Sequence, residues 1–201
     1  MSTTMKGAEV AKAMKETLIR EAEALKEKGI LPCLTIIRVG ARPDDLAYER
    51  GAKKRMELIG IECRVREFPE DISQREFEKE FQKINQDPSV HGILLFHPLP
   101  DHLDEKPVKS IIHPYKDVDC MSNVNIAKVF AGDETGFAPC TAEAVVRMLD
   151  HYGIDPKGRK VTVVGRSMVV GKPLAMLLLD RHGTVTLCHT RTADLEEECR
   201  K

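Results

Sequence analysis

Apolar positions repeat at helical spacing in the first part of the chain, and short runs rich in β-branched residues separate these repeats. The helical spacing predicts three helices, at residues 8–28, 43–60 and 73–87. The β-branched runs predict two strands, at residues 33–40 and 61–68. Gly60 is expected to end the second helix, and Ser73 is expected to cap the third.

The same alternation continues beyond these elements. Residues 91–100 predict a buried strand interrupted by Pro98 and Pro100, and a short helix is expected at 102–114. Strands that alternate with helices are typical of a parallel sheet covered by helices on both faces. The pattern therefore predicts an α/β fold.

Residues 114–138 have weak periodicity and many turn formers, which indicates a boundary between domains. The chain is expected to divide into a first domain, an interdomain stretch and a second domain, at residues 1–118, 119–138 and 139–201. The last part predicts helices at 140–153, 171–182 and 192–201, with strands at 160–165 and 184–189. Thr141 is expected to cap the first of these helices. Two strands are too few for a complete nucleotide-binding sheet.

Composition narrows the class of function. Hydrophobic residues make up 42% of the 201 residues and charged residues 31%, so a packed core is expected. The formal net charge of −1 and the aromatic content of 4% argue against nucleic-acid and anionic-membrane partners. No apolar run reaches the ~20 residues needed to span a bilayer, and we find no signal peptide. The six cysteines lack C-x-x-C spacing, so reduced thiols, a cytoplasmic location and no metal site are expected.

One glycine-containing turn looks suited to binding phosphate. The stretch "VTVVGRSMVVGKPLAMLLL" at 161–179 joins a predicted strand to a predicted helix. It is not a P-loop, because five residues rather than four separate Gly165 from Gly171, and Pro173 replaces the hydroxyl residue. It also lacks the second glycine of the dinucleotide fingerprint, since Ser167 occupies that position.

The charges around this turn favour NADP. In a βαβ unit a ligand phosphate lies at the carboxyl ends of the strands, beside a helix N-terminus. The strand at 184–189 is followed by Thr190 and Arg191 rather than by an acid that would bind ribose hydroxyls. Arg166 and Arg191 could both face a ribose phosphate. The alternative is that Gly165 and Gly171 are ordinary turn glycines and that both arginines are solvated.

Four sequence segments carry a family resemblance. "VVGRSMVVGKP", "GILLFHPLP", "HPYKDVD" and "PCT" occur in this order, and together they resemble the methylenetetrahydrofolate dehydrogenase/cyclohydrolase family of FolD type. The resemblance implies two three-layer α/β/α domains around a folate cleft, the second a Rossmann-like NADP-binding domain, and a homodimer. It also implies that members continue for several tens of residues past position 201, so the second domain is expected to be incomplete.

The resemblance implies two activities and a set of site residues. Members oxidise methylenetetrahydrofolate with a nicotinamide cofactor, and most hydrolyse the methenyl product. The G-R-S turn takes the cofactor phosphates in the family, which assigns this role to Gly165, Arg166 and Ser167. The remaining expected cofactor residues are Gly171, Thr190 and Arg191, and the expected folate residues are Tyr48, Pro98, Leu99, Pro100 and Asp119.

Several folate-site positions depart from the family pattern. The family Lys four residues after the Tyr is Ala52, and the family Gln of the Pro-Leu-Pro segment is Phe96. The family Ser three residues before the Tyr is Asp45, and the Gly of "DVDG" is Cys120. Tyr48 itself matches.

These departures affect the two reactions differently. Hydride transfer depends mainly on positioning, whereas hydrolysis of the methenyl cation needs an activated water. Ala52 and Phe96 offer no polar group for that step. Lys53 lies about 140° around the helix from Tyr48, so it points elsewhere.

Other residues near this segment keep two interpretations. Asp119 could bind the donor edge of a pterin or could stabilise a polar turn. Tyr48 could stack on the substrate or be a buried helix aromatic. His97 could be a new site group or a half-buried side chain. The basic cluster at 51–55 could attract a polyglutamate tail or be a solvated face.

Three hypotheses follow. The first is an NADP-linked methylenetetrahydrofolate dehydrogenase with weak or absent cyclohydrolase, in which Tyr48 and Asp119 act at the folate. The second is a fully bifunctional enzyme. The third is a folate- or nucleotide-binding protein without turnover. A phosphotransferase is disfavoured by Pro173.

Overall fold

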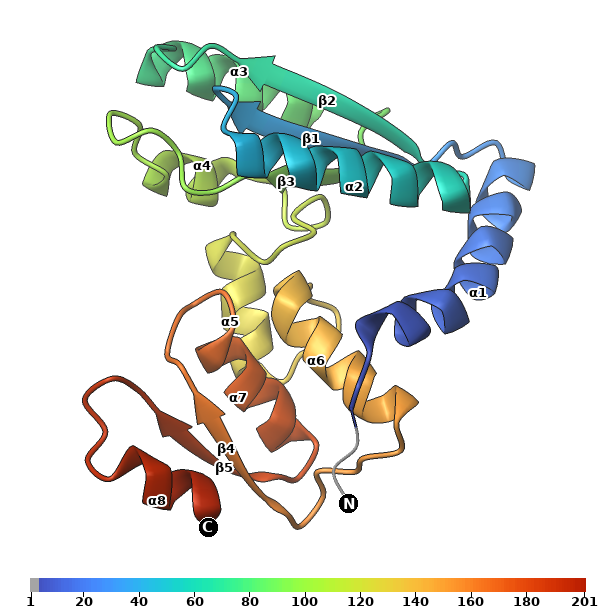
Figure 1. Cartoon of the computed structure of the whole chain (residues 1–201). Helices are drawn as coiled ribbons and strands as arrows, with labels where there is room; N and C mark the ends of the chain where they lie inside the picture. The colour runs from blue at the N-terminus through green and yellow to red at the C-terminus, as the bar shows by residue number, and fades with distance from the viewer. Residues whose placement is uncertain (1–3) are drawn as a thin grey trace. The chain divides into compact units, whose positions relative to one another are not determined.

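The structure is a computed structural model that describes residues 4–201. The chain forms two compact units (Figure 1). One unit is Lys12–Val118, and the other contains Asp119–Lys201 together with residues up to Ala11. Among the described residues, no helix is long and apolar enough to cross a membrane.

The unit of Lys12–Val118 is built on a three-stranded parallel sheet. Its elements are α1 (Gly7–Glu27, which begins in the other unit), β1 (Cys33–Val39), α2 (Pro43–Ile59), β2 (Glu62–Phe68), α3 (Gln74–Gln86), β3 (Gly92–Leu95) and α4 (Lys106–Ile111). The strand order is β2-β1-β3, with β1 in the centre. All seven elements occur where the sequence predicts them, within a few residues.

Burial of β1 on both faces explains its sequence. Ile36 and Ile37 point to opposite faces of the sheet, and both are fully buried. Phe77 and Phe81 of α3 are also fully buried, four residues apart on one helix face. A strand covered on both sides needs consecutive apolar residues rather than alternation, and "TIIRV" supplies them except at Arg38.

Two predicted helix ends in this unit are confirmed. Gly60 ends α2 in the left-handed conformation, with φ of 76°. The Ser73 hydroxyl accepts a hydrogen bond from the backbone N–H of Glu76 at 3.3 Å, which caps α3.

The second unit has a two-stranded parallel sheet. Its elements are α5 (Asn123–Ala131), α6 (Cys140–His151), β4 (Lys160–Val164), α7 (Gly171–Asp180), β5 (Thr184–Cys188) and α8 (Leu195–Arg200). Val163 packs with Leu174 and Leu178 of α7 on one face. The Thr162 hydroxyl donates to the carbonyl of Glu198 in α8 from the other face, at 3.1 Å. This β–α–β arrangement with helices on both faces matches the predicted α/β class.

Two expectations for this unit need correction. The stretch 119–138 contains a nine-residue helix, α5, although its periodicity is weak. Local signals define this helix, because the Ser122 hydroxyl caps its start and Gly132 ends it at φ 69°. The predicted cap at Thr141 is wrong, since Pro139 occupies the N-cap position of α6. The Asp119 carboxylate accepts the N–H of Cys140 at this helix end instead, at 2.8 Å.

Candidate active site

The first half of the candidate site lies beside the carboxyl ends of β1 and β3. Tyr48 of α2 is 60% exposed, and its ring meets the Phe96 ring edge to face at 5.3 Å between centroids. Phe96 follows β3 directly and is 7% exposed. The structure therefore brings Tyr48 together with Phe96. It presents the Tyr48 ring to solvent, so the buried-aromatic interpretation is wrong.

Ala52 and Lys53 follow Tyr48 by one turn of α2. Ala52 is half-buried, whereas Lys53 is exposed. Burial raises the pKa of the Cys63 thiol in β2, and the Lys53 charge acts against that rise. The Lys53 charge therefore acts on the thiol of β2.

His97 belongs to a polar network at the start of α4. Its Nδ1 lies 2.8 Å from Oε1 of Glu105, and Nζ of Lys109 lies 2.8 Å from Oε2 of the same carboxylate. Burial raises the pKa of Glu105, but the bonds from Lys109 and His97 outweigh it, so the pKa lies below its ordinary value. His97 therefore serves to hold the segment after β3 against α4.

A pocket of about 780 Å³ opens at this edge of the sheet. Its lining includes Val39, Gly40, Arg42, Pro98, Leu99 and Pro100. The carboxyl ends of parallel strands are where open α/β sheets bind ligands. The predicted substrate residues Pro98, Leu99 and Pro100 thus lie at a suitable position within their own unit.

The second half of the candidate site is the glycine turn after β4. Gly165 has φ of 132°, a conformation that side chains disfavour, and its N–H donates to the carbonyl of Cys188 at 2.8 Å. A Cβ on Gly171 would lie 1.9 Å from the carbonyl oxygen of Gly165. Both glycines are therefore required by the backbone, and the start of α7 packs directly on the turn.

The arginines and hydroxyls predicted to bind the cofactor flank this turn. Arg166 and Ser167 are exposed, and the Ser167 hydroxyl accepts the N–H of Val170 at 3.1 Å. Thr190 and Arg191 are exposed in the loop that follows β5. Parallel pairing of β4 with β5 brings both loops to the same sheet edge. The charged and polar groups expected for phosphate binding therefore share one face of this unit.

Asp119 and Cys120 begin the second unit. The Asp119 carboxylate uses Oδ1 to accept the N–H of Cys140. Cys120 has φ of 58°. This left-handed conformation costs a side chain roughly 1–2 kcal/mol.

Comparison with family models identifies both halves. The model described as tetrahydrofolate dehydrogenase/cyclohydrolase, catalytic domain, matches residues 5–119. The model described as tetrahydrofolate dehydrogenase/cyclohydrolase, NAD(P)-binding domain, matches residues 139–201. The chain belongs to this family. The resemblance carried by the four sequence segments is thereby confirmed, and the glycine turn lies in the NAD(P)-binding domain of the family.

Individual members of the tetrahydrofolate dehydrogenase/cyclohydrolase family are similar over nearly the whole chain. The bifunctional protein FolD of Clostridium kluyveri is 55% identical over 199 residues, which are 99% of this chain and 70% of that protein. FolD from Campylobacter jejuni has a TM-score of 0.94 at 37% identity, covering 98% of this chain and 70% of that one. Trypanosoma brucei FolD, solved with NADP cofactor and an inhibitor, has a TM-score of 0.92 at 33% identity, covering 99% and 69%.

One group in the first unit was not predicted from the sequence. Arg38 is 6% exposed and lies at the end of the central strand β1. The signal available in the sequence is a charged residue inside an otherwise apolar run, because such a residue must find buried partners. Its contacts are described below.

The close packing at Gly171 predicts a large effect of one methyl group. Gly171→Ala should destabilise the protein by about 1–3 kcal/mol or more, because the Cβ overlaps the Gly165 carbonyl. The matched control is Gly51→Ala in α2, whose Cβ would meet no atom of residues 4–201 within 4 Å. This control should stabilise by roughly 0.5–1 kcal/mol through helix propensity. Urea unfolding measures the free energy of unfolding of both variants. Equal stabilities would contradict the close packing of Gly171 against the Gly165 carbonyl.

The Glu105 network predicts an acid-sensitive contribution to stability. The pKa of Glu105 is lower in the folded protein than its ordinary value of 4.5, so its contribution is present above that pH and is lost as the pH falls through the folded value. Glu105→Gln should therefore be less stable than the wild type at pH 7. The difference should begin to shrink as the pH falls below 4.5 and should vanish below the folded pKa. A difference in unfolding free energy that stays constant from pH 7 to pH 3 would show that the carboxylate charge is not involved.

Proposed function

We propose that this protein oxidises methylenetetrahydrofolate to methenyltetrahydrofolate with NADP, with weak cyclohydrolase activity. The observation that carries the proposal is the glycine turn of a family NAD(P)-binding domain with exposed Arg166 beside it. The similarity to FolD proteins supports the folate substrate. A homodimer in the cytoplasm belongs to the same proposal, on the strength of the family resemblance.

The turn and its flanking loops fit NADP. Gly165 leaves backbone at the turn uncovered by a side chain, so a phosphate can approach it closely, and Gly171 lets the start of α7 pack against the turn. Arg166, Thr190 and Arg191 supply charge and hydrogen-bond donors for a ribose phosphate. NADP, which the Trypanosoma brucei structure contains, supplies the hydride acceptor when it is bound. Ser167 shapes the turn through its bond to Val170.

Tyr48 and Asp119 are proposed to hold the folate. The exposed ring of Tyr48 can stack on an aromatic part of the substrate, with Phe96 supporting it from the side. One carboxylate oxygen of Asp119 binds the Cys140 N–H, which orients the other to accept N–H groups of a pterin. Pro98, Leu99 and Pro100 shape the rim of the pocket at the sheet edge. These residues bind and orient the substrate, which is the main requirement of hydride transfer.

The cyclohydrolase step lacks its expected groups. Ala52 carries no ammonium group. Phe96 carries no polar side-chain group, and its ring packs against Tyr48. The His97 ring is hydrogen-bonded to Glu105, and helix geometry places Lys53 about 140° around α2 from Tyr48. A fully bifunctional enzyme is the second candidate, favoured by the bifunctional names of relatives as similar as the Clostridium kluyveri protein.

Arg166 is predicted to select NADP over NAD. Arg166→Ala should weaken the binding of NADP about ten- to a hundredfold, because one charge-assisted contact to the ribose phosphate is lost. The binding of NAD should stay nearly unchanged. Initial rates against each cofactor measure the effect. Arg159→Ala is the matched control, since Arg159 is exposed just before β4, at the opposite end of that strand. Equal losses for NADP and NAD would show that Arg166 does not recognise the phosphate.

Hydrolysis of methenyltetrahydrofolate is predicted to be slow. General acid–base help is typically worth about a hundred- to ten-thousandfold, and the groups that would give it are missing. The measurement is decay of methenyltetrahydrofolate absorbance with and without protein, beside the dehydrogenase rate. Ala52→Lys with Phe96→Gln should raise hydrolysis, whereas Lys53→Ala should leave it unchanged. Wild-type hydrolysis as fast as oxidation would contradict the proposal and support the bifunctional candidate.

A further inference from the structure

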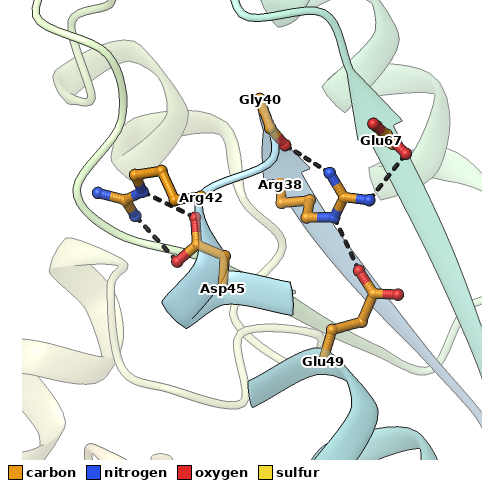
Figure 2. Close-up of polar contacts among 6 residues, drawn as sticks. All are labelled: Arg38, Gly40, Arg42, Asp45, Glu49 and Glu67. Atoms are coloured by element: carbon orange, nitrogen blue, oxygen red, sulfur yellow. Dashed lines mark hydrogen bonds and ion pairs between the residues drawn. The ribbon is translucent and has the colours of Figure 1, made fainter. Parts of the chain in front are cut away.

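The buried guanidinium of Arg38 is held on three sides. Nε donates to Oε2 of Glu49 at 2.7 Å, and Nη2 donates to Oε2 of Glu67 at 2.7 Å. Nη1 donates to the carbonyl of Gly40. Figure 2 shows these contacts converging from three separate segments: α2, β2 and the loop after β1. One side chain thus ties the helix that carries Tyr48 to two strands of the sheet.

Burial makes this arrangement sensitive to the loss of any partner. Burial alone lowers the pKa of Arg38, but the bonds to Glu49 and Glu67 raise it above its ordinary value, so the group stays charged. The Glu49 side chain is only 13% exposed. Separating two buried charges is costly, so folded molecules keep this pair closed. The contact is therefore a rigid attachment rather than a surface ion pair.

A second arginine holds the start of the same helix. Arg42 precedes α2, and its Nε and Nη2 donate to the two carboxylate oxygens of Asp45 at 2.9 and 3.0 Å (Figure 2). Asp45 is the residue that stands at the family Ser position. Tyr48 lies between Asp45 and Glu49 in sequence: the Asp45 pair is local to the first turn of α2, and the Glu49 pair attaches the helix to β1. The Tyr48 ring itself projects into solvent and contacts Phe96.

We propose that Arg38 is a positioning residue that acts through Glu49 to fix the rotation of α2, and with it the direction of the Tyr48 ring. The role of Tyr48 at the folate rests on the proposed function, whereas its positioning by Arg38 does not. Because the Tyr48 ring projects away from the axis of α2, a rotation of the helix by a few degrees displaces the ring. Small displacements of a substrate-binding group are enough to reduce productive binding.

A fluorescent reporter tests the positioning without any substrate. The chain contains no Trp, so Tyr48→Trp introduces a single reporter at the position in question. Adding Arg38→Gln should lower the anisotropy of this Trp and increase its quenching by acrylamide. Arg64→Gln is the matched control, because Arg64 of β2 also bonds a carboxylate, that of Glu62, but its side chain is 36% exposed and it lies near the amino end of that strand. Identical signals from the Arg38 and Arg64 variants would overturn the proposal.

Kinetics with Tyr48 intact give the second measurement. Arg38→Gln should raise KM for methylenetetrahydrofolate about tenfold, because a misdirected Tyr48 binds it less well, and should leave KM for NADP within about twofold. Arg38→Lys keeps the positive charge but makes fewer hydrogen bonds, so its KM for methylenetetrahydrofolate should lie between those of the wild type and Arg38→Gln. A merely structural Arg38 would lower the apparent kcat in proportion to the folded fraction and leave both KM values unchanged, and that result overturns the proposal.

One further variant secures the test against misfolding. If Arg38→Gln does not fold, Glu67→Ala removes one partner from the more exposed side, since the Glu67 side chain is 57% exposed. Glu67→Ala should lower the anisotropy of the Trp reporter and raise KM for methylenetetrahydrofolate, each by less than Arg38→Gln does. No shift in either would overturn the proposal. Absence of dehydrogenase activity in the wild type would contradict the proposed function alone, because the fluorescence measurement still decides the positioning.

Discussion

Parallel pairing of strands is the constraint on which both units depend. Parallel strands end at the same edge of a sheet, so the loops that follow β1 and β3 in one unit, and β4 and β5 in the other, emerge side by side. In each unit, such loops carry proposed site residues: Pro98 to Pro100 after β3, and Arg166 and Arg191 after β4 and β5. The residues within a half are far apart in sequence, yet the register of a few hydrogen-bonded pairs brings them together.

The two candidate regions differ in what holds their residues in place. At the glycine turn, the backbone leaves no room for a side chain at Gly171. In the other unit, Phe96 packs against Tyr48 and the Asp45 carboxylate accepts hydrogen bonds from Arg42, so side-chain contacts hold the segment around Tyr48.

Much of the fold was predictable, because hydrophobic periodicity and strong end signals coincide. Gly60 and Ser73 mark helix ends that local backbone chemistry alone determines. The helix α5 was missed because a short helix shows little periodicity, and the Thr141 cap was wrong because Pro139 begins that helix. Arg38 could not be assigned, since its partners come from two other elements and only the tertiary structure joins them. Residues matched to family motifs could be named, but the bond between Asp119 and Cys140 could not.

The most direct test of the account is formation of NADPH when the protein is mixed with NADP and methylenetetrahydrofolate. The account predicts NADPH absorbance that grows in proportion to protein concentration, with far slower growth when NAD replaces NADP. Titration calorimetry with NADP alone should be run beside it. Binding of NADP without any NADPH formation would contradict the account and identify the chain as a nucleotide-binding protein without turnover.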